Sequence, residues 1–185
     1  MKRRVMSLVI VTLAVLFALS GAWAEEDPFE AMTVYEEGQY RVGRDMVADE
    51  YVLLATDRYE GYFCISSDAN GRDILANDLF EVNSIVTVKD GEYFEMDRCM
   101  AVRAEDFYKK YTIHTDKPGV MLKVGYDILP GEYKLICTDD DYGYYCIYED
   151  SRHQDITAND LFKKSAWVSV EAGQYLILSR CYIQE

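Results

Sequence analysis

Short apolar runs bounded by Gly, Pro, Asp or Asn recur along the chain once its N-terminal segment has passed. Residues 51–56 form one such run. Residues 85–88 and 93–96 flank an Asp-Gly pair, the strongest short signal for a β-hairpin, and residues 167–170 and 175–178 flank Ala-Gly in the same way. No segment of this region keeps the 3.6-residue period of an amphipathic helix. The pattern predicts β-strands joined by tight turns.

The same phrases return 82 residues later without a gap. Residues 74–80 read ILANDLF and residues 156–162 read ITANDLF, and nearly half of the positions between Val42 and Cys99 match their counterparts between Val124 and Cys181. Such self-similarity at a fixed offset indicates a duplicated structural unit. We therefore expect an all-β protein made of two tandem homologous antiparallel β-sandwich or small-barrel repeats.

The repeat and the N-terminal pattern together predict the organisation of the chain. The expected segments are a signal peptide at 1–24, an N-terminal lead-in at 25–39, a first β repeat at 40–103, a connector at 104–120 and a second β repeat at 121–185. A repeat of this size would be only marginally stable by itself. We expect the two repeats to pack together or to be stapled by disulfides.

The two-residue period of a strand predicts which side chains face each core. The face that differs less between the copies is the one expected inside. This face carries Tyr51, Leu53 and Ala55 in the first copy and Tyr133, Leu135 and Cys137 in the second. A second core stripe is expected at Phe94, Met96, Leu176 and Leu178.

The N-terminal segment has the three parts of a secretory signal peptide. A basic head at residues 2–4 precedes an apolar run from Val5 to Leu19, and Ala22-Trp23-Ala24 offers a small-x-small cleavage site. The apolar run is shorter than the roughly 20 residues that span a bilayer. We expect a secreted or extracytoplasmic protein without a membrane span after cleavage.

The chain is strongly acidic, with a net charge of −14 at pH 7. Binding to nucleic acid or to an anionic membrane requires a basic face, so the charge argues against both. It is compatible with simple solubility, or with attraction to a cation or a basic partner.

Four of the five cysteines form a duplicated pair with equal spacing in each copy. In an exported chain this pattern favours disulfides Cys64–Cys99 and Cys146–Cys181. Two alternatives stay open. Cys137 and Cys146 flank a predicted hairpin and would pair across it, or all five residues are buried free thiols.

An acidic loop follows the first cysteine of each copy and offers oxygen ligands of the kind that calcium prefers. Its candidate ligands are Asp68, Asp73, Asn77 and Asp78 in the first copy, and Asp150, Asp155, Asn159 and Asp160 in the second. The spacing is not that of an EF-hand. The alternative is that these side chains make Asx-turns and caps, with the Leu and Phe of the repeated phrase filling the core.

The recurring tyrosines Tyr62 and Tyr144 lie beside these loops. Together with Asp73 and Asp155 they are the candidate ligand-binding residues, because tyrosines next to acids and amides can stack on a sugar or a peptide. The alternative is that they only make cross-strand pairs. No G-x-S-x-G, H-E-x-x-H or Gly-rich phosphate loop occurs, so catalytic residues are not predicted.

The second copy also carries the phrase VGYDILPGEYKL at residues 124–135, followed by Gly143-Tyr-Tyr and Gly173-Gln-Tyr. These phrases resemble the "VGxDIPAGEY"-type repeat domain of small exported or surface-attached proteins of Gram-positive bacteria. The resemblance covers both copies, although the first departs from it at Ala48-Asp49. It implies an exported all-β module and no particular activity.

The sequence therefore predicts a secreted, non-catalytic binding or cell-envelope-associated module whose ligand is a glycan, a peptide or an envelope component. The alternative function is a secreted hydrolase or inhibitor, with calcium as a stabilising ion.

Overall fold

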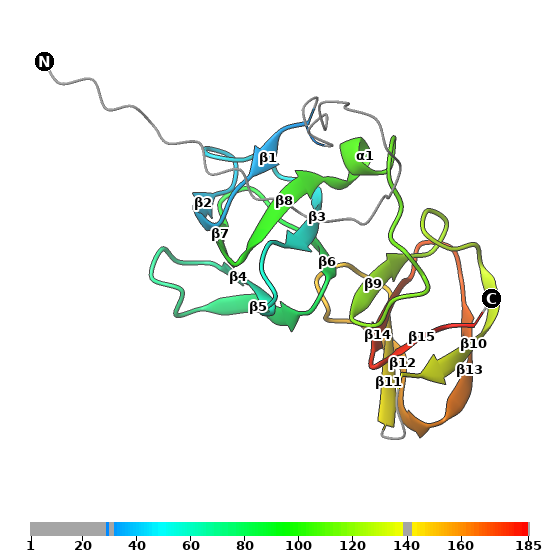
Figure 1. Cartoon of the computed structure of the whole chain (residues 1–185). Coiled ribbons are helices and arrows are strands. Elements are labelled where there is room, and N and C mark those ends of the chain that lie inside the picture. The colour runs from blue at the N-terminus through cyan, green and yellow to red at the C-terminus, as the bar shows by residue number, and fades with distance from the viewer. Residues whose placement is uncertain (1–28, 30–31, 139–141, 185) are drawn as a thin grey trace, which may run out of the picture.

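The computed structural model describes residue 29, residues 32–138 and residues 142–184. It is all-β, as predicted, and its strands form two sandwich-like halves that correspond to the two sequence repeats (Figure 1). The predicted signal peptide lies outside the described residues. Within the described part of the chain, no helix is long and apolar enough to cross a membrane.

The first repeat consists of two four-stranded antiparallel sheets. Sheet 1a has the order β1-β8-β3-β6, and sheet 1b has the order β2-β7-β4-β5. The strands are β1 (Val34–Tyr35), β2 (Gly38–Arg41), β3 (Glu50–Ala55), β4 (Gly61–Ser66), β5 (Ile74–Phe80), β6 (Asn83–Thr87), β7 (Tyr93–Asp97) and β8 (Cys99–Arg103). β1 and the first residues of β2 come from the segment expected to lead into the repeat.

The second repeat reproduces this arrangement, strand for strand, apart from β1. Sheet 2a has the order β13-β10-β15, and sheet 2b has the order β12-β11-β14-β9. The strands are β9 (Val120–Lys123), β10 (Gly131–Cys137), β11 (Tyr142–Tyr148), β12 (Ile156–Lys163), β13 (Ser165–Val170), β14 (Tyr175–Ser179) and β15 (Cys181–Ile183). Even the isolated bridge Val42–Met46 recurs as Val124–Ile128.

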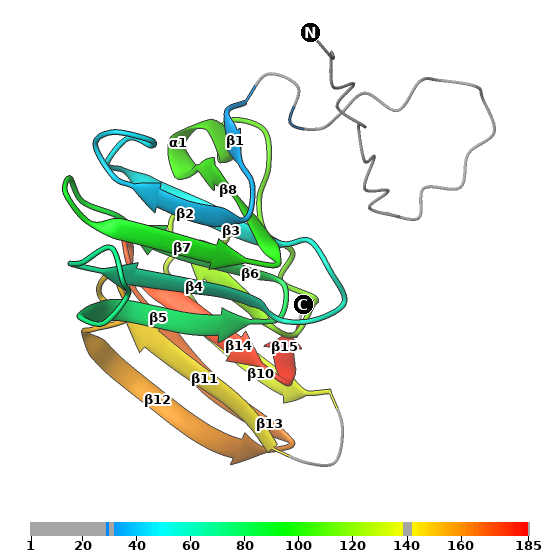
Figure 2. The ribbon, with the colours of Figure 1, turned by 90° about the vertical axis from the view of Figure 1, so that its left-hand side faces the viewer.

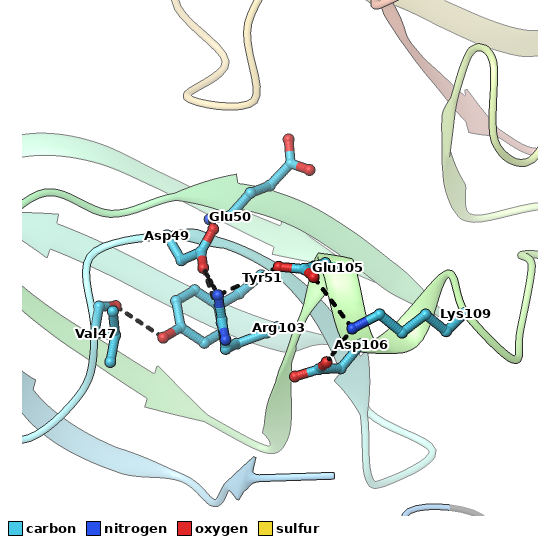
Figure 3. Close-up of polar contacts among 8 residues, drawn as sticks. All are labelled: Val47, Asp49, Glu50, Tyr51, Arg103, Glu105, Asp106 and Lys109. Atoms are coloured by element: carbon cyan, nitrogen blue, oxygen red, sulfur yellow. Dashed lines mark hydrogen bonds and ion pairs between the residues drawn. The ribbon is translucent and has the colours of Figure 1, made fainter.

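The connector contains a single helical turn, α1 (Ala104–Phe107), that follows β8. Arg103, the last residue of β8, anchors this turn by bonding to Asp49 through Nε at 2.8 Å and by approaching Glu105 at 3.6 Å (Figure 3). Lys109 pairs in turn with Glu105 at 3.1 Å and with Asp106 at 3.0 Å. The network holds the start of the connector against the first repeat.

The predicted core faces are confirmed in part, because Ala55 and Tyr133, which were expected inside, are only half-buried. Tyr51 and Leu53 are fully buried, as is Leu135. In the second stripe Phe94, Met96, Leu176 and Leu178 are each 2% exposed or less. Tyr51 also donates its hydroxyl to the Val47 carbonyl at 2.8 Å, and its counterpart Tyr133 donates to Leu129 at 2.7 Å, so each repeat fastens the loop before this strand in the same way (Figure 3).

The repeated phrase is a strand rather than a turn, which corrects one sequence interpretation. Alternation along β5 buries Ala76 and Phe80, whereas Leu79 points outward and is 54% exposed. β12 repeats the pattern, with Phe162 buried and Leu161 55% exposed. Phe fills the core as expected, but the expectation for Leu was wrong because neighbouring strand residues face opposite sides.

The outer face of sheet 2b packs on the β6 edge of the first sandwich, and α1 packs on β3 and β8 of sheet 1a. Val52, Ile85 and Val102 of sheet 1a are fully buried and belong to the same apolar cluster as Met121 of β9. The equivalents of Val52 and Leu54 in the second repeat are Lys134 and Ile136, on a sheet that nothing in the described chain covers to the same degree. The second repeat therefore packs on the first. The two repeats differ in sequence at these positions because only the first repeat is covered there.

Polar contacts fix the register of this stack. The Asn83 amide donates to the Met121 carbonyl at 2.8 Å and accepts the Met121 N–H at 3.1 Å, in a fully buried position. Glu50 accepts hydrogen bonds from the Lys123 ammonium and the Tyr175 hydroxyl. Because buried polar groups are costly unless paired, these contacts favour one relative placement of the two repeats.

The predicted disulfides are absent: all five cysteines are free and buried. Cys64 lies in sheet 1b opposite Asn77 and Glu95, whereas Cys99 lies in sheet 1a and directs its thiol to the Tyr62 carbonyl at 3.4 Å. Cys146 and Cys181 are divided between sheets 2b and 2a in the same way, with Cys181 donating to Tyr144 at 3.3 Å. The equal spacing of the cysteines places them at equivalent positions in the two repeats, but the two cysteines of each repeat lie in different sheets and are not bonded to each other.

Candidate binding surface

One set of side chains recurs in both repeats without contributing to either core. On β5 these are Ile74, Asn77 and Leu79, which share the outer face of sheet 1b because the register shifts between Ile65 and Ser66. On β12 they are Ile156, Asn159 and Leu161, which share the outer face of sheet 2b through the corresponding shift. We call these six residues the outer stripes.

The outer stripes are exposed to nearly the same extent in the two repeats. Ile74 and Ile156 are 51% and 49% exposed, and Leu79 and Leu161 are 54% and 55% exposed. Burial in a core cannot explain why these apolar residues recur, because neither repeat buries them. Within the described part of the chain, β5 and β12 are also end strands of their sheets, each hydrogen-bonded to one neighbouring strand.

The candidate tyrosines lie directly beside the stripes. Tyr62 is the cross-strand partner of Leu79, and Tyr144 is the cross-strand partner of Leu161. Both are partly buried. Burial raises the pKa of both phenols, in the case of Tyr144 to about 12 with a contribution from Cys146, so both remain neutral hydrogen-bonding groups at physiological pH.

The surroundings of the two tyrosines differ because of how the repeats stack. Tyr62 lies on the outer face of sheet 1b, whereas Tyr144 lies near Asp78 of the first repeat, whose charge also raises the pKa of the Tyr144 phenol. Figure 2 shows the β4–β5 hairpin beside β11 and β12. The two stripes are thus equivalent in sequence and strand position but not in their neighbours.

The first aspartate of each acidic loop binds the loop's own backbone. Asp68 accepts from the N–H groups of Asn70 at 2.8 Å, Arg72 at 3.1 Å and Asp73 at 2.7 Å, and these bonds lower its pKa. Asp150 accepts from Arg152 at 2.6 Å and Asp155 at 3.0 Å. The geometry is that of the turn and cap alternative.

The calcium candidates of the repeated phrase lie on the strands that follow these two loops. Asn77, Asp78, Asn159 and Asp160 lie on β5 and β12, and Asp78 instead accepts the Leu79 N–H at 2.9 Å and lies 3.2 Å from His153. Asp73 accepts the Ser67 hydroxyl. Among the described residues, no group of three or more His, Cys, Asp and Glu side chains is placed to hold a metal ion.

The acidic loop of the second repeat has a role that the sequence did not suggest. His153 enters the open edge of the first sandwich, where its ring meets Phe63 edge-on at 5.6 Å and stacks on Tyr148 at 5.1 Å. Arg152 forms a two-point pair with Glu92 at 3.0 Å for both bonds, with side chains only 10% and 12% exposed. The one indication of this role in the sequence is that residues 151–154 share no identity with their counterparts at 69–72.

A shallow hollow also lies where the repeats meet. It is lined by Arg58, Glu60, Glu81, Val82, Lys117 and Pro118. The neighbouring Gly119 approaches Glu81 closely, since a Cβ atom there would lie 2.6 Å from the Glu81 Cβ, and its carbonyl accepts the Val82 N–H at 3.0 Å. The walls mix two cations with two anions, so the hollow favours no ligand charge.

The chain has no match among protein-family models, among curated proteins or among solved structures. The resemblance to a repeat domain of exported Gram-positive proteins therefore stays a prediction, and the outer stripes are the features from which a function can be argued.

Proposed function

We propose that the protein is an exported, non-catalytic module that binds an extended polypeptide segment along its outer stripes. The observation that carries the proposal is the recurrence of the same exposed residues, Ile, Asn and Leu, on equivalent end strands of both repeats. Duplication has kept these residues where the fold does not use them.

Three properties support a polypeptide as the ligand. Exposed Ile and Leu offer apolar contact area, whereas sugars are usually bound by aromatic faces and hydrogen-bonding groups. β5 and β12 each have an unpaired side in their sheet, and an extended peptide can add to such an edge through main-chain hydrogen bonds. The net charge of −14 favours encounter with a basic segment.

Asn77 and Asn159 add polar groups between the apolar residues of each stripe, next to Tyr62 and Tyr144. Two equivalent sites on one chain would strengthen binding to a ligand that carries the segment more than once, since the second contact becomes intramolecular. Export is the part of the proposal that depends on the signal peptide at residues 1–24.

The test begins with the mature protein on peptide and glycan arrays. The double variant Leu79→Ser, Leu161→Ser should lose binding to its peptides by about tenfold or more, since each buried leucine contact is worth roughly 1.5–3 kcal/mol. Its melting temperature should barely change, because both side chains are exposed in the free protein.

The matched control is Leu129→Ser, which removes an exposed leucine, 73% exposed, from a loop outside the stripes. It should bind like the wild-type chain. Binding to glycans alone, or equal loss of binding in the control and in the double variant, would contradict the proposal.

A further inference from the structure

Two of the five free cysteines, Cys137 and Cys181, are direct cross-strand neighbours. They are Cα partners at the end of the β10–β15 ladder. On either side, Thr138 N–H donates to Arg180 at 3.0 Å and Gln184 N–H donates to Lys134 at 2.9 Å, which marks those pairs as the hydrogen-bonded ones. Alternation along the ladder makes Cys137 and Cys181 a non-hydrogen-bonded pair.

This kind of pair has the spacing that a disulfide needs. Non-hydrogen-bonded partners have Cα atoms about 4.5 Å apart, and disulfides join residues whose Cα atoms are roughly 4.4–6.8 Å apart. The other cysteines lack such a partner, since Cys64 is opposite Asn77 and Glu95, and Cys146 is opposite Asn159 and Ile177.

The side chains of the pair converge on one small space above Gly143 of β11. A Cβ atom at Gly143 would lie 3.0 Å from the Cys181 Cβ and 3.1 Å from the Cys137 Sγ. Both cysteines therefore point to the same side of sheet 2a and approach the same point.

The pair exists in the second repeat only. In the first repeat the cross-strand partner of Cys99 is Ala55, although the backbone register is the same. Cys137, which has no cysteine counterpart in the first repeat, thus lies opposite Cys181, whose counterpart is Cys99.

We propose that Cys137 and Cys181 form a disulfide when the protein is oxidised, fastening β15 to β10. The Sγ–Sγ bond forms with the loss of one proton and one electron from each thiol. An external disulfide, such as that of glutathione or of a thiol oxidoreductase, accepts both electrons and both protons and leaves as two thiols, by way of a mixed disulfide with one of the cysteines.

Access to the pair requires a local opening. Cys137 is 8% exposed and Cys181 is fully buried, and burial raises the pKa of the Cys181 thiol to about 12. β15 is three residues long and lies at the end of sheet 2a, so it can separate from β10 without unfolding the sandwich. Oxidation should therefore be slow in the folded protein and faster during folding.

The experiment uses the mature chain refolded with oxidised and reduced glutathione, followed by blocking of free thiols and non-reducing peptide mapping by mass spectrometry. The expected product is one disulfide, joining the peptides of Cys137 and Cys181, with the other three cysteines blocked. The oxidised protein should melt about 5–10 °C above the reduced one.

The variant Cys137→Ala recreates the Ala55–Cys99 pairing of the first repeat, so it is expected to fold, and it should show no such rise in melting temperature. Cys64→Ala is the control that should keep both the disulfide and the rise. Five blocked thiols in the oxidised sample, or a disulfide that joins Cys64 to Cys99 or Cys146 to Cys181, would overturn the proposal.

Discussion

At the scale of single residues, the two copies assign different surroundings to the same amino acid. Asp45 and Asp127 occupy equivalent positions, and each accepts the backbone N–H four residues earlier, at 3.0 and 2.7 Å. Asp45 is exposed and bonds to Arg44, whereas the connector covers Asp127 with the Ile113 N–H at 2.7 Å and the Tyr108 hydroxyl at 2.9 Å. Identity in sequence therefore does not imply identity in chemistry.

The two aspartates should titrate on opposite sides of the ordinary value. The side-chain bond from Arg44 lowers the pKa of Asp45, and burial raises the pKa of Asp127. Carboxyl carbon shifts, followed by NMR from pH 2 to pH 7, should show Asp45 titrating below about 3.8 and Asp127 above it. The reverse order would contradict the assigned environments.

The sign of the effect on stability follows from these directions. A raised pKa in the folded state gives Asp127 a contribution that is complete below its unfolded pKa and is lost as pH rises through its folded pKa. The contribution of Asp45 is present above its unfolded pKa and is lost as pH falls. The stability of the wild type relative to Asp127→Asn should therefore decrease from pH 3.5 to pH 7 in urea unfolding.

Asn83 is the residue on which the register of the stack most depends. Asn83→Ala leaves the buried N–H and carbonyl of Met121 without partners, and should cost about 2–3 kcal/mol in urea unfolding. Ser165→Ala changes the equivalent but exposed position of the second repeat and should alter stability by less than about 0.5 kcal/mol. Equal effects of the two changes would contradict the role of Asn83.

At the scale of elements, each repeat depends on a close approach between a glycine in β4 or β11 and the Phe of the repeated phrase. A Cβ atom at Gly61 would lie 2.6 Å from Phe80 Cζ and 3.2 Å from the Cys99 Cβ. Gly143 faces Phe162 and Cys181 in the same way. These two glycines recur because the aromatic ring lies over their backbone.

Substitution of Gly61 by Ala should therefore overpack the first core. We expect Gly61→Ala to lose about 1–3 kcal/mol of unfolding free energy in urea. Gly131→Ala is the control, because the nearest atom to a Cβ there lies 3.9 Å away, on Tyr133. A Gly61→Ala protein as stable as the control would show that Phe80 does not occupy this position.

The hairpins at residues 85–96 and 167–178, the division into two β repeats and most core positions could be predicted from the sequence, because two-residue alternation and the fixed offset are local signals. The strands β5 and β12 could not, because their phrase was interpreted as a turn. The packing of one repeat on the other could not. Val52 and Leu54 differ from Lys134 and Ile136, which indicates a changed environment but not what covers it. The insertion of His153 depends on a left-handed backbone, with a φ of 58°, where the first copy has Gly71.

The candidate site was predicted in part. Tyr62 and Tyr144 do lie beside exposed surface, but the neighbouring leucines were assigned to the core because the phrase was interpreted as a turn. The acidic residues were predicted as candidate calcium ligands, whereas Asp68 and Asp150 accept hydrogen bonds from backbone N–H groups of their own loops. The residue types in a loop do not distinguish a carboxylate that caps the loop from one that binds a metal ion.

At the scale of the whole molecule, the two repeats form a single unit. Sheet 2b packs on β6 of the first sandwich within one shared apolar cluster, and the loop at residues 149–155 contacts the same sandwich through Arg152 and His153. Neither repeat could separate without exposing Val52, Ile85 and Met121. The outer stripes stay accessible at the ends of their sheets.

Native-state hydrogen exchange on the mature protein tests this claim most directly. If the repeats form one cooperative unit, the slowest amides of β3 and β4 should report the same free energy of opening as those of β11 and β14, and Asn83→Ala should lower both together. Two separate plateaus, with the variant lowering only one of them, would show that the repeats are independent domains and would contradict the account.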